Sequence, residues 1–142
     1  MTQVNDDCAV WVGLEAPDGL LYSIQELADD PDLLKECQPL DRRDGAVVFS
    51  DSENEILAQG IFLYVGSEVL MTGGEVLAKG EAYHHMAYQD DSPLDLEPKG
   101  DTLVITDLLE DVSVTMPLAA TLVAFKAEAD ALGAFVTEHG ST

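Results

Sequence analysis

Apolar residues recur at short intervals through residues 55–88, the longest stretch of the chain with almost no helix punctuation. Gly66-Ser67 and Gly73-Gly74 divide it into lengths that suit strands. In residues 56–65, apolar side chains fall on both sides of an alternating pattern, which is typical of a central strand. Residues 69–71 form a run short enough for a strand between two glycine-bearing turns. We therefore predict that the stretch forms the middle of an antiparallel sheet.

Residues 75–88 alternate in a different way, because their two sides differ in polarity. One side carries Val76, Ala78, Gly80, Ala82, His84, Met86 and Tyr88, and the other carries Glu75, Leu77, Lys79, Glu81, Tyr83 and His85. A strand with one face on the core and one face in water has this pattern. We predict such a strand here, with His85 on its wetter face.

Helix signals appear early in the chain. Ser23 and Glu26 have the spacing of a capping box, which predicts a short helix starting there. Asp30 as the N-cap and Pro31 as the first helical residue would start a second short helix over residues 31–36. Residues 8–14 and 46–49 are short apolar runs, and we predict that both are strands.

The C-terminal half contains a predicted hairpin and the clearest helix. Residues 89–101 hold two prolines and many acids, which favours a long loop. Residues 102–106 and 112–116 are expected to pair as strands around the acidic turn 107–111. After Pro117, apolar residues recur at intervals of three and four, which draws one stripe along a helix. That stripe consists of Leu118, Leu122, Phe125, Ala129, Leu132 and Val136, and Gly140 is the expected stop.

These elements predict an α+β fold. We expect a single domain of 142 residues, with a mainly antiparallel sheet of about six strands covered by a long C-terminal helix and a short N-terminal helical segment. Cys8 and Cys37 lack metal or redox spacing, so free buried thiols are expected. No apolar run approaches membrane-spanning length and the first residues include acids, which predicts a cytoplasmic protein.

Motifs for catalysis are missing from the sequence. It has no phosphate-binding glycine loop, no nucleophile elbow and no Cys/His cluster with zinc spacing, so we predict no catalytic site, metal or cofactor. Residues 51–55 alternate acids as a calcium loop does, but the glycine that such a loop requires is absent. His85 beside Glu81 could serve as a general base, but a solvated sheet face explains the same residues without an extra assumption and is the favoured interpretation. His84 is expected at the margin of the core.

Charge restricts the class of partner. The chain has 28 acidic residues against six basic ones, a formal net charge of −22 spread over its whole length. Self-repulsion of this size destabilises a compact chain. Binding to nucleic acid or to an anionic membrane depends on lysine and arginine, so both are disfavoured as direct partners. A macromolecular partner is expected to be basic.

We therefore expect a non-enzymatic acidic binding protein that covers a basic protein, as an immunity protein neutralising a nuclease or a DNA mimic would. Acids on loops are the expected contacts: Asp90, Asp91, Asp95 and Glu97 first, then Asp107, Glu110 and Asp111, with Tyr83 and Tyr88 as aromatic anchors. Two alternatives stay open. The acids could be an adaptation to high salt in a protein of unknown role, or the His85 face could belong to a small enzyme or ligand-binding domain.

Overall fold

A computed structural model describes residues 2–86 and 93–139 of the chain. The fold is α+β, as predicted, but the described residues form nine strands in two antiparallel sheets instead of about six in one. The strands are β1 (Thr2–Gln3), β2 (Ala9–Glu15), β3 (Leu21–Ser23), β4 (Asp44–Ser50), β5 (Glu55–Ile61), β6 (Tyr83–His85), β7 (Leu94–Lys99), β8 (Thr102–Asp107) and β9 (Val112–Pro117). The helices are α1 (Ile24–Asp29), α2 (Pro31–Cys37), α3 (Phe62–Gly66), α4 (Gly74–Ala78) and α5 (Leu118–His139), with a 3-10 turn η1 (Leu40–Arg42) and a π-helical segment η2 (Ser67–Gly73).

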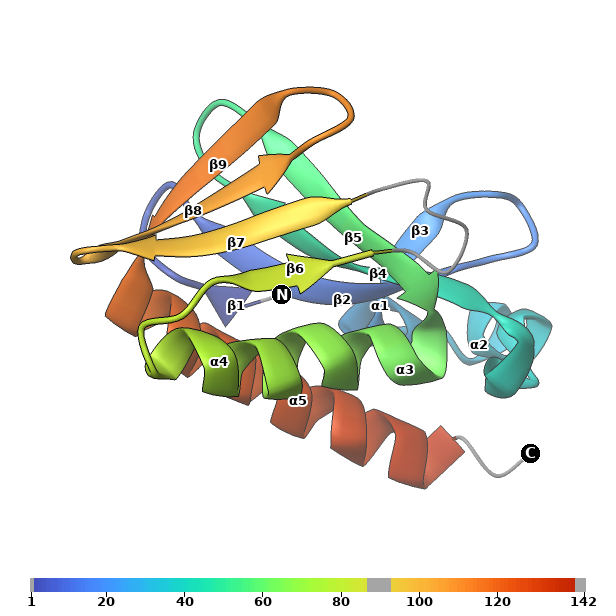
Figure 1. Ribbon diagram of the computed structural model, residues 1–142. Coiled ribbons are helices and arrows are strands. Elements are labelled where there is room, and N and C mark those ends of the chain that lie inside the picture. Colours follow the sequence, from blue (N-terminus) through green and yellow to red (C-terminus); the bar gives the residue numbers. More distant parts are fainter. Residues whose placement is uncertain (1, 87–92, 140–142) are drawn as a thin grey trace.

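The two sheets divide along the chain. The N-terminal sheet has the order β1-β2-β4-β5, with β3 also paired to β2, and the C-terminal sheet has the order β6-β7-β8-β9. Strand β5 contacts β8 and β9, which brings the sheets together on one side. Figure 1 shows the helical run α3–η2–α4 and the long helix α5 lying along the lower side of both sheets. Buried residues from the two sheets and from these helices form one continuous apolar core.

Residues 62–78 are helical, which corrects the prediction of strands through this region. Strand β5 ends at Ile61, and α3, η2 and α4 then follow without a break. The predicted strand 69–71 therefore lies in the π-helical segment, and of the predicted strand 75–88 only Tyr83–His85 is extended among the residues described. We call residues 62–78 the central helix.

Close packing explains the glycines that resemble turns in the sequence. Gly66 and Gly73 both have helical backbone angles. A Cβ atom on Gly66 would lie 2.2 Å from Leu132 Cδ2, and one on Gly73 would lie 3.1 Å from the ring of Tyr83. The helix tolerates these glycines despite their low helix propensity because a larger residue would push its neighbours away.

Several other local predictions are confirmed. Ser23 and Glu26 form the capping box at the start of α1, and the Asp30 side chain accepts the Leu33 N–H at the start of α2. The hairpin β8–β9 has the predicted strands. Both cysteines are free and buried. The predicted loop 89–101 is wrong at Leu94–Lys99, where β7 forms part of the C-terminal sheet, and residues 89–92 of that prediction lie outside the described residues.

Helix α5 carries the predicted apolar stripe, and all six of its residues lie in the core or pack against it. Gly140, the expected stop, lies outside the described residues. No helix in the described part of the chain combines the length and apolar character that a membrane span requires.

A buried carboxylate on α5 completes the N-terminal sheet. Strand β1 pairs with β2 as far as Val10 and β3 pairs with it from Gly13, so the side of β2 between them has no neighbouring strand. Glu128 fills this gap, since its Oε1 accepts the backbone N–H of Val12 at 3.0 Å and its Oε2 accepts the hydroxyl of Thr2 at 2.5 Å. Its side chain is nearly inaccessible to solvent. Glu128 therefore replaces a strand partner with a helix side chain.

We predict that Glu128→Ala lowers the free energy of unfolding by about 1–3 kcal/mol, because the buried Val12 N–H loses its acceptor. Urea unfolding measures this difference. Asp130→Ala is the matched control, since it removes one negative charge from an exposed position on the same helix and should change stability by less than about 0.5 kcal/mol. Equal effects of the two substitutions would contradict the role of Glu128.

Candidate partner-binding surface

The outer face of the C-terminal sheet carries a polar row across all four strands. Its register places His84 opposite Asp95, Asp95 opposite Thr106, and Thr106 opposite Ser113. The His84 Nδ1 atom and the Asp95 carboxylate form a short contact, and the hydroxyls of Thr106 and Ser113 lie 3.1 Å apart. We call this surface the acidic face. Its Asp95 is held in place by a neighbour on β6.

Glu97 lies on the acidic face two residues beyond Asp95. Both carboxylates are partly buried on strand β7, where the sequence predicts a loop. Glu97 Oε2 is 3.5 Å from Lys99 Nζ on the same strand. The structure therefore brings two of the predicted contact residues together, on a rigid sheet instead of a loop.

The β8–β9 turn (residues 107–111) groups three more of the predicted acids. Asp107 Oδ1 accepts the backbone N–H groups of Leu109 at 3.0 Å and Glu110 at 3.1 Å. The backbone of Asp111 is left-handed, with φ of 56°, a conformation that aspartate tolerates better than most residues. Asp107 thus shapes the turn, while Glu110 and Asp111 are exposed.

Two leucines at the tip of this turn face solvent. Leu108 is 53% exposed and Leu109 is 67% exposed, between Asp107 and Glu110. Our sequence prediction singled out the acids of this turn and overlooked the leucines. The signal was present, because a Leu-Leu pair inside a polar turn has no core to enter.

Tyr83 lies on the other face of the C-terminal sheet from Asp95. It packs against the core, with its ring against Gly73 of the central helix. Burial, followed by the charge of Glu68, raises the pKa of Tyr83 above its ordinary value. The structure therefore does not bring Tyr83 together with the acids of the turn. Tyr88, Asp90 and Asp91, the remaining predicted contacts, lie outside the described residues.

The two histidines have the opposite environments to those predicted. The His84 side chain is 68% exposed, whereas His85 is only 3% exposed. Tyr83 and His85 do share a face, but that face is the core side of β6. The prediction assumed one continuous strand from residue 75, so it assigned the wet face from residues that belong to α4 and the turn after it.

His85 lines a small pocket between β5, the central helix and β6. The pocket has a volume of about 140 Å³, and Tyr64, Glu68 and Met86 contribute to its wall. The Nε2 atom of His85 is 2.8 Å from the backbone oxygen of Gln59 on β5. This hydrogen bond connects the edge strand of the C-terminal sheet to the N-terminal sheet. Tyr64 and Met86 are both more than half exposed.

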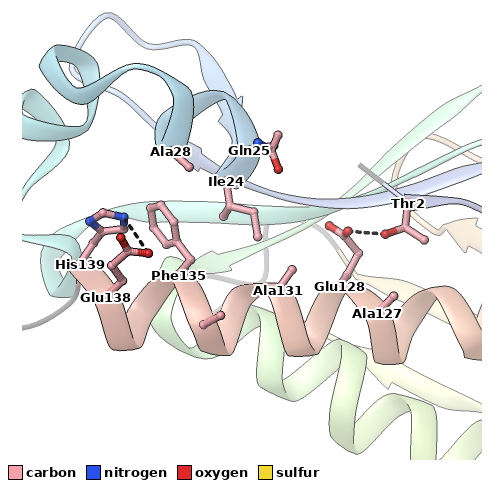
Figure 2. Close-up of a pocket in the computed structure, with 11 residues that line it drawn as sticks. Thr2, Ile24, Gln25, Ala28, Ala127, Glu128, Ala131, Phe135, Glu138 and His139 are labelled. Carbon is pink, nitrogen blue, oxygen red and sulfur yellow. Dashed lines mark hydrogen bonds and ion pairs between the residues drawn. The ribbon is translucent and has the colours of Figure 1, made fainter.

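A larger groove lies between α1 and α5 (Figure 2). It has a volume of about 440 Å³ and a wall rich in alanine, with Phe135 near one end. The Glu128 carboxylate at the other end points toward Thr2, which it binds. His139 Nε2 lies 3.8 Å from the Glu138 carboxylate. The polar side chains of Thr2, Glu128, Glu138 and His139 in this groove thus already bind one another or the backbone.

Asp51 holds the β4–β5 turn against β9, the outer strand of the hairpin. Its Oδ1 accepts the backbone N–H groups of Glu53 and Asn54, each at 2.8 Å, and its Oδ2 accepts that of Thr115 at 3.2 Å. Partial burial alone would raise the pKa of Asp51, but the three N–H donors outweigh it and lower the pKa below its ordinary value. The Asn54 side chain also donates to Ser113 O at 3.1 Å.

Carboxylates cover the rest of the described surface with few lysine or arginine partners. Glu128 is the one buried carboxylate among residues 2–86 and 93–139. Of the exposed and partly exposed carboxylates in that part of the chain, Glu97 alone forms an ion pair with a lysine or arginine. No group of three or more potential metal ligands occurs in the residues described. The negative charge is therefore directed outward and left uncompensated by lysine or arginine.

We compared the chain with models of known protein families, with curated proteins and with solved structures, and none of them matches it.

We predict that Asp51→Ala lowers the free energy of unfolding by about 1–3 kcal/mol at pH 7, because three backbone N–H groups lose a charged acceptor. The pKa of Asp51 is lower in the folded state than in the unfolded state, where it is near 3.8. Its stabilisation is therefore complete above that pH and is lost as the pH falls through the folded-state pKa.

Urea unfolding of the wild type and Asp51→Ala from pH 7 to pH 2 measures this dependence. The difference between the two proteins should shrink below about pH 4. Glu53→Ala, which removes a neighbouring exposed carboxylate, should show only a small, nearly pH-independent difference. A difference for Asp51→Ala that persists undiminished at pH 2 would contradict the assignment.

Proposed function

We propose that this chain is a non-enzymatic acidic binding protein that covers the cationic surface of a basic protein. A nuclease or another nucleic-acid-binding protein is the kind of partner that fits, as for an immunity protein or a DNA mimic. The observation that carries the proposal is the β8–β9 turn, where two exposed leucines stand among carboxylates. A cytoplasmic location is part of the same proposal.

Charge and apolar contact would have separate roles at this turn. Carboxylates attract a basic surface over distance and raise the association rate, and they contribute less to the lifetime of a complex. Buried apolar anchors at the centre of an interface limit the dissociation rate. Leu108 and Leu109 would supply such anchors inside a rim formed by Asp107, Glu110 and Asp111.

The acidic face would extend the contact surface beyond the turn. Asp95 and Glu97 lie on a paired strand, so their positions change little on binding and little conformational entropy is lost. Carboxylates fixed at strand spacing could occupy places where a basic groove binds phosphates.

To test the role of the acids, a basic protein captured from a lysate is identified, purified and then measured by surface plasmon resonance. We predict that Glu110→Lys combined with Asp111→Asn slows its association about tenfold at low salt, with a smaller effect at 0.5 M NaCl. Asp111→Asn preserves the preference for the left-handed backbone. Glu36→Lys combined with Asp41→Asn changes the net charge equally at another exposed site and is the matched control.

If both pairs of substitutions slow association equally, the partner does not contact the turn. The effect would then come from the net negative charge of the whole surface.

The leucines call for a separate measurement on the same partner. We predict that Leu108→Ser combined with Leu109→Ser accelerates dissociation about tenfold or more, with association nearly unchanged, because apolar burial is lost while charge is kept. Leu20→Ser is the control, since Leu20 is 59% exposed on a different turn. An unchanged dissociation rate for the double substitution would contradict the role of the leucines as anchors.

Adaptation to high salt is the second explanation, favoured by the near absence of ion pairs among the described surface carboxylates. The thermal midpoint from low salt to several molar NaCl separates the two. Our proposal predicts a chain already folded at low salt, with a modest gain that ends once Debye screening is complete, near 1 M. The thermal midpoint could instead lie near ambient temperature in dilute buffer and rise steeply through molar salt. That result would show that the acids are an adaptation to high salt and would contradict our proposal.

A further inference from the structure

The pocket at His85 holds a hydrogen-bond acceptor that the fold does not use. The backbone oxygen of Gln59 can only accept, so the Nε2 atom of His85 carries the hydrogen of their bond. In the neutral imidazole, Nδ1 then has a free lone pair.

The Nδ1 atom of His85 keeps some contact with solvent. Every buried side-chain nitrogen and oxygen in the described residues has a hydrogen-bond partner. Gln59 O is the one hydrogen-bond partner of His85 in the described residues, so Nδ1 is reached by solvent although the residue as a whole is 3% exposed. The pocket is the opening that His85 lines.

Three neighbours add groups suited to a planar cation. Glu68 supplies a carboxylate from the π-helical segment, and such segments often occur at functional sites. Tyr64 supplies an aromatic ring that is 58% exposed, and Met86 a thioether that is 55% exposed. Aromatic faces attract cations, and arginine does so more often than lysine.

We propose that this pocket binds the guanidinium group of an arginine side chain from the basic partner. A guanidinium has five donors in a fixed plane, so it can pair with the Glu68 carboxylate, donate to His85 Nδ1 and stack on Tyr64. This inference rests on the proposed function and names the chemistry by which the partner is recognised. No lysine or arginine is among the described residues that line the pocket, which leaves the charge of Glu68 available there.

The pocket and the β8–β9 turn lie at the same end of the C-terminal sheet. Register places His85 opposite Leu94, and Leu94 opposite Asp107 at the start of the turn. Two strand spacings, about 10 Å, separate β6 from β8. One partner surface can therefore reach the leucines of the turn and place an arginine in the pocket.

The test is a titration of the full chain, labelled at histidine and tyrosine, followed by NMR at constant ionic strength. Nα-acetyl-arginine amide is the probe, and Nα-acetyl-citrulline amide is its neutral isostere. We predict saturable shifts of the His85 ring and Tyr64 signals with the arginine probe, and at least about tenfold weaker binding of the citrulline probe. Equal responses to both probes would overturn the proposal.

Substitutions locate the binding within the pocket. Glu68→Gln should weaken arginine binding about tenfold, because it removes the charge that pairs with the guanidinium. Glu75→Gln, which removes an exposed carboxylate from α4, should leave it unchanged. His85→Gln keeps a donor for Gln59 O, but its acceptor oxygen cannot occupy the position of the ring Nδ1 atom, so it should weaken the shift of Tyr64. Equal weakening by Glu68→Gln and Glu75→Gln would overturn the site. Both positions are exposed, so neither substitution is expected to disturb the folding of the core.

The outcomes separate this inference from the proposed function. Binding of a basic partner that depends on the turn, without an arginine-specific response at His85, would overturn the pocket alone. Arginine-specific binding in a chain whose captured basic partner ignores the turn substitutions would keep the pocket and overturn the contact at the turn.

Discussion

The close contact between the central helix and α5 determines how the two sheets are placed. At Gly66 the central helix approaches Leu132 so closely that no side chain fits between them. The rings of Phe62 and Phe135 meet nearby at right angles, with centroids 6.1 Å apart. Because the central helix follows β5 directly and leads into β6, the depth of this contact sets the distance between the last strand of one sheet and the first strand of the other. The hydrogen bond from His85 to Gln59 O depends on that distance.

A chain with a net charge of −22 folds only if its carboxylates stay in water or find donors. Glu128 satisfies the second condition, because the gap between β1 and β3 leaves the Val12 N–H for it to bind. Asp51 and Asp107 do so in turns, where backbone N–H groups gather around each carboxylate. Exposed acids that bind no donor add repulsion without stabilising the fold, and Glu110 and Asp111, which the proposed binding function uses, are among them.

Local signals in the sequence were sufficient where an element depends on its own residues. The capping box at Ser23, the hairpin β8–β9 and the stripe along α5 all follow from near neighbours in the chain. The central helix does not, because Gly66 and Gly73 are favourable there only through contacts with Leu132 and Tyr83. That error also exchanged the core face and the solvent face of β6, so the exposed and the buried histidine were exchanged. The acids of the candidate surface were predictable from charge. Leu108 and Leu109 were also open to prediction, as a leucine pair inside a polar turn, and the structure shows that both are exposed.

The relation between the pocket and the turn follows from the same constraint. In the proposed site His85 offers Nδ1 to the arginine because Gln59 O binds its other nitrogen, and Gln59 belongs to the strand that leads into the central helix. His85, Leu94 and Asp107 lie opposite one another on β6, β7 and β8, so the strand pairing fixes the position of the turn relative to the pocket. A partner that contacts both places meets a rigid sheet edge, so its arginine and its apolar residues must match a spacing fixed in the free protein. Such preorganisation favours recognition of one basic surface over others that differ only in the arrangement of their charges.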